Sequence, residues 1–119
     1  MFTSYFGNIK NLPKGQTVAI SQGVPVWYKG KRYLKLAPTW QMIRIKEAEE
    51  YTKQYFDILA ALQPAQVFAE LKELAGTDAI LLCWEKPGEF CHRSLVADWF
   101  KKHLGVEVPE YPQRQPALI

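Results

Sequence analysis

Three neighbouring residues, Cys91, His92 and Arg93, have side chains suited to chemistry, and Glu85 lies shortly before them. A thiol near a helix start has its pKa lowered by the helix dipole and by a neighbouring cation, which makes it a better nucleophile. Imidazole and carboxylate groups can move a proton, and a guanidinium offers paired donors to a phosphate. We therefore predict Cys91, His92 and Glu85 as catalytic residues and Arg93 as the residue that holds an anion.

The elements around this segment predict how these side chains are positioned. Residues 79–84 form an unbroken apolar run between two helical patterns, which is typical of a central parallel strand. Residues 91–104 are predicted to be a helix, so Cys91 lies at its start. Ligands of parallel sheets bind beyond the carboxyl ends of the strands, and helix starts favour anions. Cys83, at the end of this strand, is therefore a further ligand-binding candidate, with a buried core thiol as the alternative.

Other chemistries of the same segment are less favoured. A zinc site would use Cys83, Cys91 and His92, with His103 as a further ligand. This set matches no common finger spacing, and side chains of adjacent helical residues diverge by roughly 100°. A phosphatase-type loop would need an arginine where Ala97 or Glu89 stands. A redox pair of the two cysteines stays open, although it lacks the Cys-x-x-Cys spacing. We expect no metal, no cofactor and two free thiols in a reducing, cytoplasmic compartment. For Arg93, the structural alternative is an ion pair with Glu85 or Glu89.

A second candidate site is the basic and aromatic segment at residues 26–36, which contains Trp27, Tyr28, Lys31 and Arg32. Its residues resemble those of a strand, but Gly30 interrupts them, so we predict an exposed loop or an irregular hairpin. Cations for phosphates and aromatic faces for bases are typical of nucleic-acid binding. The alternative is a solvated hairpin whose lysines keep a sheet edge soluble.

The remaining pattern predicts the fold class: a small single α/β domain at residues 1–119, with a mostly parallel sheet flanked by helices. Ser4 and Ser21 lie near the ends of the first two predicted strands, on the side where a ligand would bind, and simple turn hydrogen bonds are the alternative. Further elements are expected as strands at residues 2–6, 16–21 and 106–108, a short helix at 38–45, helices at 47–62 and 64–75, and a partly extended tail at 106–119.

Composition supports a globular protein with an uneven charge distribution. The chain has 119 residues, 48% of them hydrophobic, and a formal net charge of +3. Residues 1–46 carry eight Lys and Arg residues and no acid, whereas residues 47–119 carry all twelve acids. Such a basic half favours an anionic partner. We expect no membrane-spanning segment and no signal peptide, since the sequence shows neither a long apolar run nor a charged start before an apolar core.

Residues 81–100 resemble the signature of the domain-of-unknown-function family 488. Members carry an apolar strand, Cys-x-Glu, a short loop, Cys-His-Arg and an amphipathic helix, and the matching residues here are Cys83, Glu85, Cys91, His92 and Arg93. The chain departs upstream, where many members have an Asp-Val-Arg-like segment and residues 18–21 here read Val-Ala-Ile-Ser. An expected acid and base are therefore absent or replaced by Lys29, Lys31 or Arg32. The resemblance implies an α/β fold and a site at the Cys-His-Arg turn, and it supplies no reaction.

These observations support three functional hypotheses. The first is an enzyme-like domain that binds a phosphorylated or nucleic-acid ligand at the Cys-His-Arg helix start. The second is a non-catalytic nucleic-acid-binding module that uses the basic half of the chain. The third is a structural or partner-binding protein.

Overall fold

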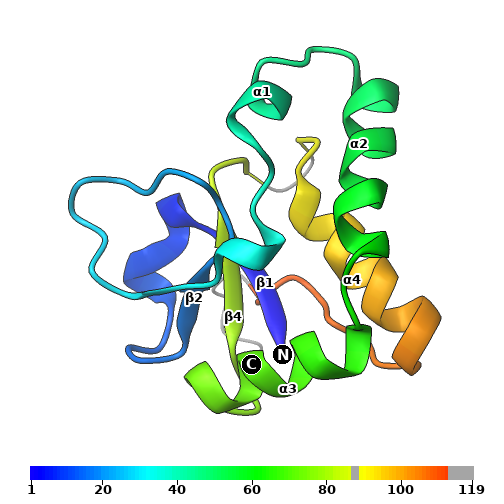
Figure 1. The fold of residues 1–119 in the computed structure, drawn as a ribbon. Coiled ribbons are helices and arrows are strands. Elements are labelled where there is room, and N and C mark those ends of the chain that lie inside the picture. Colours follow the sequence, from blue (N-terminus) through cyan, green and yellow to red (C-terminus); the bar gives the residue numbers. More distant parts are fainter. Residues whose placement is uncertain (87–88, 113–119) are drawn as a thin grey trace, which may run out of the picture.

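A four-stranded parallel sheet forms the centre of the protein, with the strand order β1-β4-β2-β3. The structure is a computed structural model, and it describes residues 1–86 and 89–112. The strands are β1 (Phe2–Tyr5), β2 (Thr17–Ala19), β3 (Lys31–Arg32) and β4 (Ile80–Cys83). All of their carboxyl ends therefore meet at one edge of the sheet, which lies at the top in Figure 1.

The apolar run predicted as a central strand is β4. It pairs with β1 on one side and with β2 on the other, with Leu81 opposite both Thr3 and Val18. Every residue of β4 is buried. A strand covered on both faces needs apolar side chains at every position, which explains the absence of alternation in this stretch.

Side chains on the two faces of the sheet enter two separate cores. Val18, Ile20 and Leu81 point into the larger core, which packs against the long helices. Ala19, Ile80 and Leu82 point into a smaller core on the other face, together with Phe6, Leu12 and Tyr28. Successive strand residues point to opposite faces, so this division follows directly from the two-residue period of a strand. The sheet is thus the middle layer of three.

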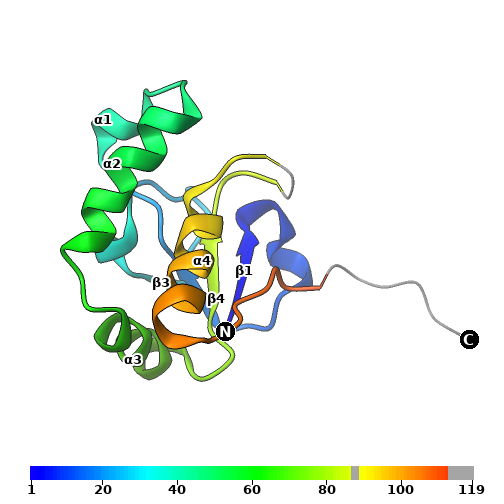
Figure 2. The ribbon, with the colours of Figure 1, turned by 90° about the vertical axis from the view of Figure 1, so that its right-hand side faces the viewer.

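Helices cover the larger core. They are α1 (Trp40–Ile43), α2 (Ala48–Ala60), α3 (Pro64–Ala75) and α4 (His92–Leu104), and the short 3-10 helices are η1 (Phe6–Asn11) and η2 (Leu34–Leu36). Helix α4 packs on β1 and β4, helix α3 packs on β2, and α2 packs on α4. Helix η1 lies on the opposite side of the sheet from α2 and α3 (Figure 2). The small α/β fold predicted from the sequence is confirmed.

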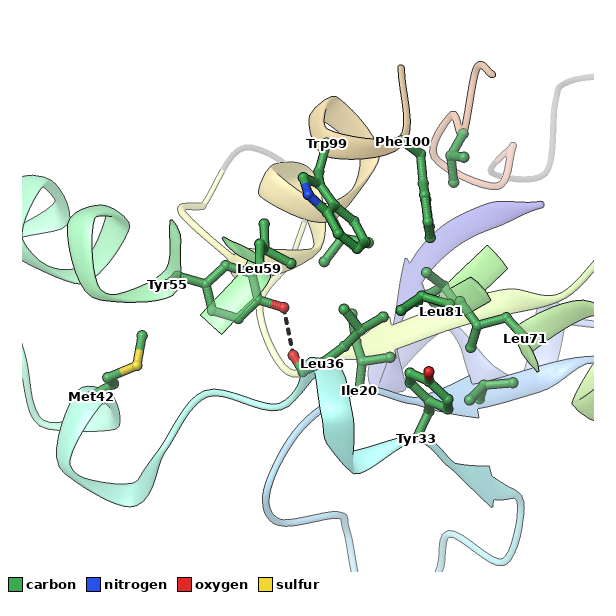
Figure 3. Packing of buried hydrophobic residues seen from close by; sticks show 14 residues of the cluster. Ile20, Tyr33, Leu36, Met42, Tyr55, Leu59, Leu71, Leu81, Trp99 and Phe100 are labelled. Atoms are coloured by element: carbon green, nitrogen blue, oxygen red, sulfur yellow. Dashed lines mark hydrogen bonds between the residues drawn. The ribbon is translucent and has the colours of Figure 1, made fainter. Parts of the chain in front are cut away.

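Tyr55 joins helix α2 to the centre of the larger core. Its ring is completely buried, and its hydroxyl donates a hydrogen bond of 2.5 Å to the carbonyl oxygen of Leu36 (Figure 3). A buried hydroxyl without a partner would cost free energy, so this bond fixes the segment containing η2 against α2. The contact holds α2 where Ala48 and Tyr51 of its first turn line a cavity at the carboxyl ends of β2 and β4.

Residues 26–36 were predicted as an exposed loop or irregular hairpin, and the structure corrects this. They contain β3, which is exposed as expected but pairs parallel to β2, with Lys31 opposite Val18. The hydroxyl of Tyr28 donates to the carbonyl oxygen of Lys31 at 2.7 Å and lies 3.3 Å from the Thr17 hydroxyl. These contacts turn the chain back, so that β3 runs in the same direction as its neighbour.

The strand predicted at residues 106–108 is absent, and a single parallel bridge joins Thr3 to Glu110 instead. Thr3 donates to the carbonyl oxygen of Pro109 and accepts from the amide of Tyr111. Pro109 has no N–H, which limits the ladder that this segment can form. The rest of the predicted tail, residues 113–119, lies outside the described residues. Within the described part of the chain, no helix has the length and apolar character needed to cross a membrane.

Candidate functional site

A cavity of about 430 Å³ lies at the carboxyl ends of β2 and β4. The segments that follow these strands border it, together with α1, the start of α2 and the start of α4, which lie near one another at the top of Figures 1 and 2. This is the edge at which parallel sheets bind ligands. The lining side chains that matter below are Ser21, Gln22, Trp40, Ile43, Lys46, Tyr51, Cys83, Trp84, Glu85, Phe90, Cys91 and His92.

Aromatic side chains form the rim of this cavity. Trp40, Trp84 and Phe90 keep 60%, 51% and 45% of their surface exposed. The indole N–H of Trp84 donates to the carbonyl oxygen of Gly23 at 3.0 Å. A Cβ at position 23 would lie 3.4 Å from the Trp40 ring, so this second indole also closes on the same glycine. Exposed aromatic surface grouped around a cavity is typical of a binding site.

Glu85 is the carboxylate of the cavity. It is partly buried, and burial is the main reason that its pKa is raised; nearby Arg93 opposes this effect and Glu89 adds to it. Burial also raises the pKa of the Tyr51 hydroxyl, and the charge of Glu85 raises it further. The Tyr51 ring packs edge-on against Phe90 with centroids 5.3 Å apart. A carboxyl group with a raised pKa in an apolar cavity can act as a general acid or base.

His92 lies at the start of α4 with 3% of its surface exposed. Its Nε2 lies 2.7 Å from the carbonyl oxygen of Ile20, so Nε2 must carry the proton and donate it. Its Nδ1 faces the Cys91 sulfur at 3.8 Å. Burial lowers the pKa of His92 to about 4, with the charge of Arg93 as a smaller cause, while the bond to Ile20 acts in the opposite direction. The ring is therefore neutral at pH 7, with Nδ1 as an acceptor.

Cys83 and Cys91 were expected to be free thiols, and the structure corrects this. Their sulfurs form a disulfide with an S–S distance of 2.04 Å. Cys91 is the N-cap of α4, with extended backbone angles of φ −151° and ψ 146°. Because Cys91 lies outside the helix, its side chain reaches back to the end of β4 and also lies beside His92.

The position of Cys91 also changes the argument about metals. The sequence argument against zinc assumed that Cys91 and His92 are both helical, which would make their side chains diverge. Among the described residues, Cys83, Cys91 and His92 are grouped closely enough to hold a metal, with ligand atoms within 4.8 Å of one another. A disulfide sulfur lacks the negative charge of a thiolate and is a poor metal ligand, so with the two sulfurs bonded to each other Nδ1 of His92 is the effective donor of this group.

Arg93 was predicted to hold an anion, and the structure directs it elsewhere. The side chain is buried, with 3% of its surface exposed. Its Nη1 donates to the Cys83 sulfur at 2.8 Å and to the carbonyl oxygen of Glu85 at 2.6 Å. Its Nε forms an ion pair with Glu110 at 2.6 Å. Arg93 thus ties the end of β4 to the segment after α4, outside the lining of the cavity.

The basic and aromatic segment contributes to the cavity at one point. Arg32 donates a hydrogen bond to the carbonyl oxygen of Gln22, a lining residue. Lys31 instead bonds the carbonyl oxygen of Gly15, before β2, at the opposite end of the sheet. Tyr28 is buried in the smaller core. Trp27 is half-exposed and packs edge-on against Phe6, which in turn packs against Trp84.

The two predicted serines behave differently. Ser21 lines the cavity and donates to the carbonyl oxygen of Gly23 at 2.6 Å. Ser4 is completely buried and accepts a bond from the Asn8 side chain, away from the cavity. Of the site residues predicted from the sequence, five line the cavity: Ser21, Cys83, Glu85, Cys91 and His92.

Sequence reasoning missed the aromatic rim and Lys46. The position of Trp84 could have been predicted, because this residue directly follows the buried strand β4 and must therefore lie at the carboxyl edge of the sheet. The indication from the sequence is weaker for Trp40. Thr39 caps α1 by accepting a hydrogen bond from the Met42 amide, and this places Trp40 at the start of a short helix. Phe90 and Lys46 lie in connecting segments, and no period predicts their positions.

The fold and the site together define a small parallel α/β domain with an aromatic-lined cavity at the carboxyl ends of its strands. The chain belongs to the DUF488-N3a family, described as the active DUF488-N3 subclade, whose model matches residues 7–104. This match confirms the family resemblance drawn from the Cys-x-Glu and Cys-His-Arg segments. Comparisons with curated proteins and with solved structures gave no match.

Proposed function

We propose that the chain is an enzyme-like domain that takes the base of a nucleotide, free or within a nucleic-acid strand, into the cavity and moves a proton with Glu85. One observation carries the proposal: a carboxyl group with a pKa raised by burial faces a cavity whose rim is made of Trp40, Trp84 and Phe90. Such a pairing of flat aromatic surface with an acid–base group suits a planar substrate that needs protonation or deprotonation.

The size and charge of the cavity support this ligand class. A volume of about 430 Å³ lies within the range of roughly 300–1,000 Å³ that is typical of small-molecule sites. Lys46 lines the cavity, and Arg32 lies beside it through its bond to Gln22. These two cations can meet a phosphate at the rim while the base stacks on an indole. Stacking of this kind tolerates any base, because every base has a π face.

The contacts favour one of the three predicted catalytic residues, Glu85, over the other two. Cys91 cannot attack a substrate while its sulfur is bonded to Cys83. The pKa of about 4 keeps His92 neutral, and its only proton is committed to the carbonyl oxygen of Ile20. Glu85 has neither restriction, so it is the residue to which we assign proton transfer. Tyr51, whose raised pKa keeps its hydroxyl protonated, is suited to donate a hydrogen bond beside it.

The proposal is tested by titrating the protein with nucleoside monophosphates and with a short single-stranded oligonucleotide, by calorimetry. We expect binding that weakens as salt rises, because phosphate contacts release counterions. Glu85→Gln is expected to retain binding and to lose any conversion of the bound compound, followed by mass spectrometry of the ligand. Absence of binding to every base and to the oligonucleotide would contradict the proposal.

A second candidate function is nucleic-acid binding without catalysis. The observation that favours it is the exposed edge strand β3, whose two residues, Lys31 and Arg32, are both cationic. This function predicts that replacing these two residues weakens oligonucleotide binding, whereas Glu85→Gln changes nothing in either assay. The Glu85→Gln comparison therefore separates the two functions. A protein that binds none of the ligands would instead fit the structural or partner-binding hypothesis.

A further inference from the structure

We propose that Cys83–Cys91 is a redox-active disulfide that exchanges with a low-molecular-weight thiol entering the cavity, with Cys91 as the sulfur attacked and Cys83 as the leaving group. This activity is additional to the proton transfer assigned to Glu85. It rests on where the disulfide lies and on the different neighbours of its two sulfurs.

The first observation is location. Both cysteines line the cavity, at the end of β4 and at the cap of α4, although 1% and 3% of their surfaces are exposed. A molecule must therefore enter the cavity to reach the sulfurs. The disulfide also closes the connecting segment that carries Trp84, Glu85 and Phe90, which are themselves lining residues. A thiol bound among these side chains would lie beside the bond that it attacks.

The second observation is that the two sulfurs have different partners. Arg93 donates from Nη1 to the Cys83 sulfur at 2.8 Å, and its guanidinium is fixed in place by Glu110 and by the carbonyl oxygen of Glu85. A buried cation with a donor aimed at a sulfur stabilises the thiolate, and the better stabilised thiolate leaves faster. Cys91 instead faces Nδ1 of His92 at 3.8 Å. Because Nε2 of this ring carries the proton and donates it to the carbonyl oxygen of Ile20, Nδ1 is free to accept a hydrogen bond from the S–H group of a reduced Cys91.

The exchange then proceeds in two steps. A thiolate attacks the Cys91 sulfur, a new S–S bond forms to Cys91, and the bond to Cys83 breaks with its electron pair left on Cys83 as a thiolate beside Arg93. A second thiolate attacks the outer sulfur of this mixed disulfide, which releases the small disulfide and leaves Cys91 reduced. Two thiols are oxidised to one disulfide and the protein disulfide is reduced. Of the two thiol protons, one ends on Cys91 and the other enters solvent.

The test compares two single variants, each of which leaves one thiol in the chain. The thiol of each variant can attack an aromatic disulfide, dithiobis(nitrobenzoate), in the folded protein and keep one nitrothiobenzoate group. We expect the pH at which labelling reaches half of its maximal rate to be roughly one unit lower for Cys83 in Cys91→Ser than for Cys91 in Cys83→Ser, because Arg93 stabilises the Cys83 thiolate. The released thiolate gives the rate by absorbance, and intact mass gives the label. The double Cys→Ser variant is the control, because the chain has only two cysteines.

A second measurement addresses the leaving group. Reduction of the unmodified protein by glutathione is expected to slow roughly tenfold in Arg93→Gln, while Glu110→Gln, which keeps Arg93 beside Cys83, reduces at nearly the original rate. Circular dichroism establishes that each variant is folded. Equal pH midpoints for the labelling of the two single-cysteine variants, a lower midpoint for Cys91, or reaction only after denaturation would overturn the proposal. If Arg93→Gln does not fold, the labelling comparison still decides.

Discussion

The indole N–H of Trp84 donates to the carbonyl oxygen of Gly23, so a half-exposed aromatic ring after β4 is fixed to the segment after β2. This bond spans the carboxyl ends of two neighbouring strands and holds the ring at the rim of the cavity. Trp40 lies against the same glycine from the side of α1. An aromatic surface that is already fixed loses little freedom when a ligand stacks on it, which favours binding.

Replacement of Trp84 tests the role of this ring in ligand binding. Trp84→Ala removes the ring and is expected to weaken nucleotide binding by about 1–3 kcal/mol, the contribution of one stacked base. Trp84→Phe keeps a ring but loses the bond to Gly23, so an intermediate loss is expected. Calorimetric titration measures both variants. Trp27→Ala is the control, because Trp27 is equally exposed but lies outside the lining, and an equal loss in this variant would count against the assignment.

The stability of the protein should respond to Glu85 in a direction that follows from its pKa. Because the pKa is higher in the folded protein than in the unfolded chain, the folded state holds this proton more firmly. Unfolding free energy is therefore lost as pH rises through the interval between the two values, and ionised Glu85 destabilises the fold at pH 7. We expect Glu85→Gln to raise the melting temperature at pH 7 and to have little effect in acid.

Thermal melts of both proteins across the acid range measure this effect. Glu73→Gln is the control, because Glu73 is an exposed acid on α3, whereas Glu89 itself contributes to the pKa of Glu85. A melting temperature that falls at pH 7 in Glu85→Gln would show that the carboxylate stabilises the fold instead.

His92 should make stability depend on pH in the opposite direction. Its pKa is about 4 in the folded protein and 6.5 in the unfolded chain, so the unfolded chain takes up the proton first. The contribution of neutral His92 to the stability of the folded protein is therefore complete above about pH 6.5, and it is lost as the pH falls towards 4. At about 1.4 kcal/mol per pKa unit, the full effect is on the order of 3 kcal/mol.

His92→Gln keeps a donor that can reach the carbonyl oxygen of Ile20 but removes the titration. We expect its stability to fall less between pH 7 and pH 4 than that of the unmodified protein, as measured by urea denaturation at each pH. The exposed His103 on α4 is the other histidine of the chain, and His103→Gln is the control. If His92→Gln shows the same pH dependence as the unmodified protein, the assignment is wrong.

Arg93 is expected to matter for stability as well as for the disulfide. Arg93→Ala removes the bonds to the Cys83 sulfur and to the carbonyl oxygen of Glu85, together with the ion pair to Glu110. We expect a loss of roughly 2–4 kcal/mol in the free energy of unfolding, because a buried, well-bonded cation is replaced by a void. Urea denaturation measures it, and the exposed Arg44→Ala is the control. Equal stability of the two variants would contradict this role.

The fold was predictable where the sequence has a strong local period. Helix α3 has the predicted bounds, and α2, α4 and β4 differ from the prediction only at their ends. Strand β3 was missed because its parallel pairing depends on the Tyr28 hydroxyl and on Thr17, a contact between segments that no period reveals. The predicted strand at residues 106–108 failed for a similar reason, since pairing to β1 occurs at Glu110.

The site was predictable in part. The family signature and the end of a buried strand placed Cys83, Glu85, Cys91 and His92 at the carboxyl edge of the sheet, and they line the cavity there. The orientation of Arg93 was not predictable, because its carboxylate partner comes from a distant segment rather than from the nearby acids that the sequence suggested. The disulfide was missed because Cys91 was assumed to lie within the helix.

The central position of β4 has a consequence for how the chain folds. β1 and β2 do not pair with each other, and each forms its ladder with β4, which comes much later in the sequence. Until residues 80–83 leave the ribosome, β1 lacks its partner β4, and β2 can pair only with the short, exposed β3. Contacts between such distant segments form slowly. During synthesis the N-terminal segments therefore remain open to aggregation or to chaperones until β4 inserts between them, and the larger core is complete only when α4 packs on the sheet.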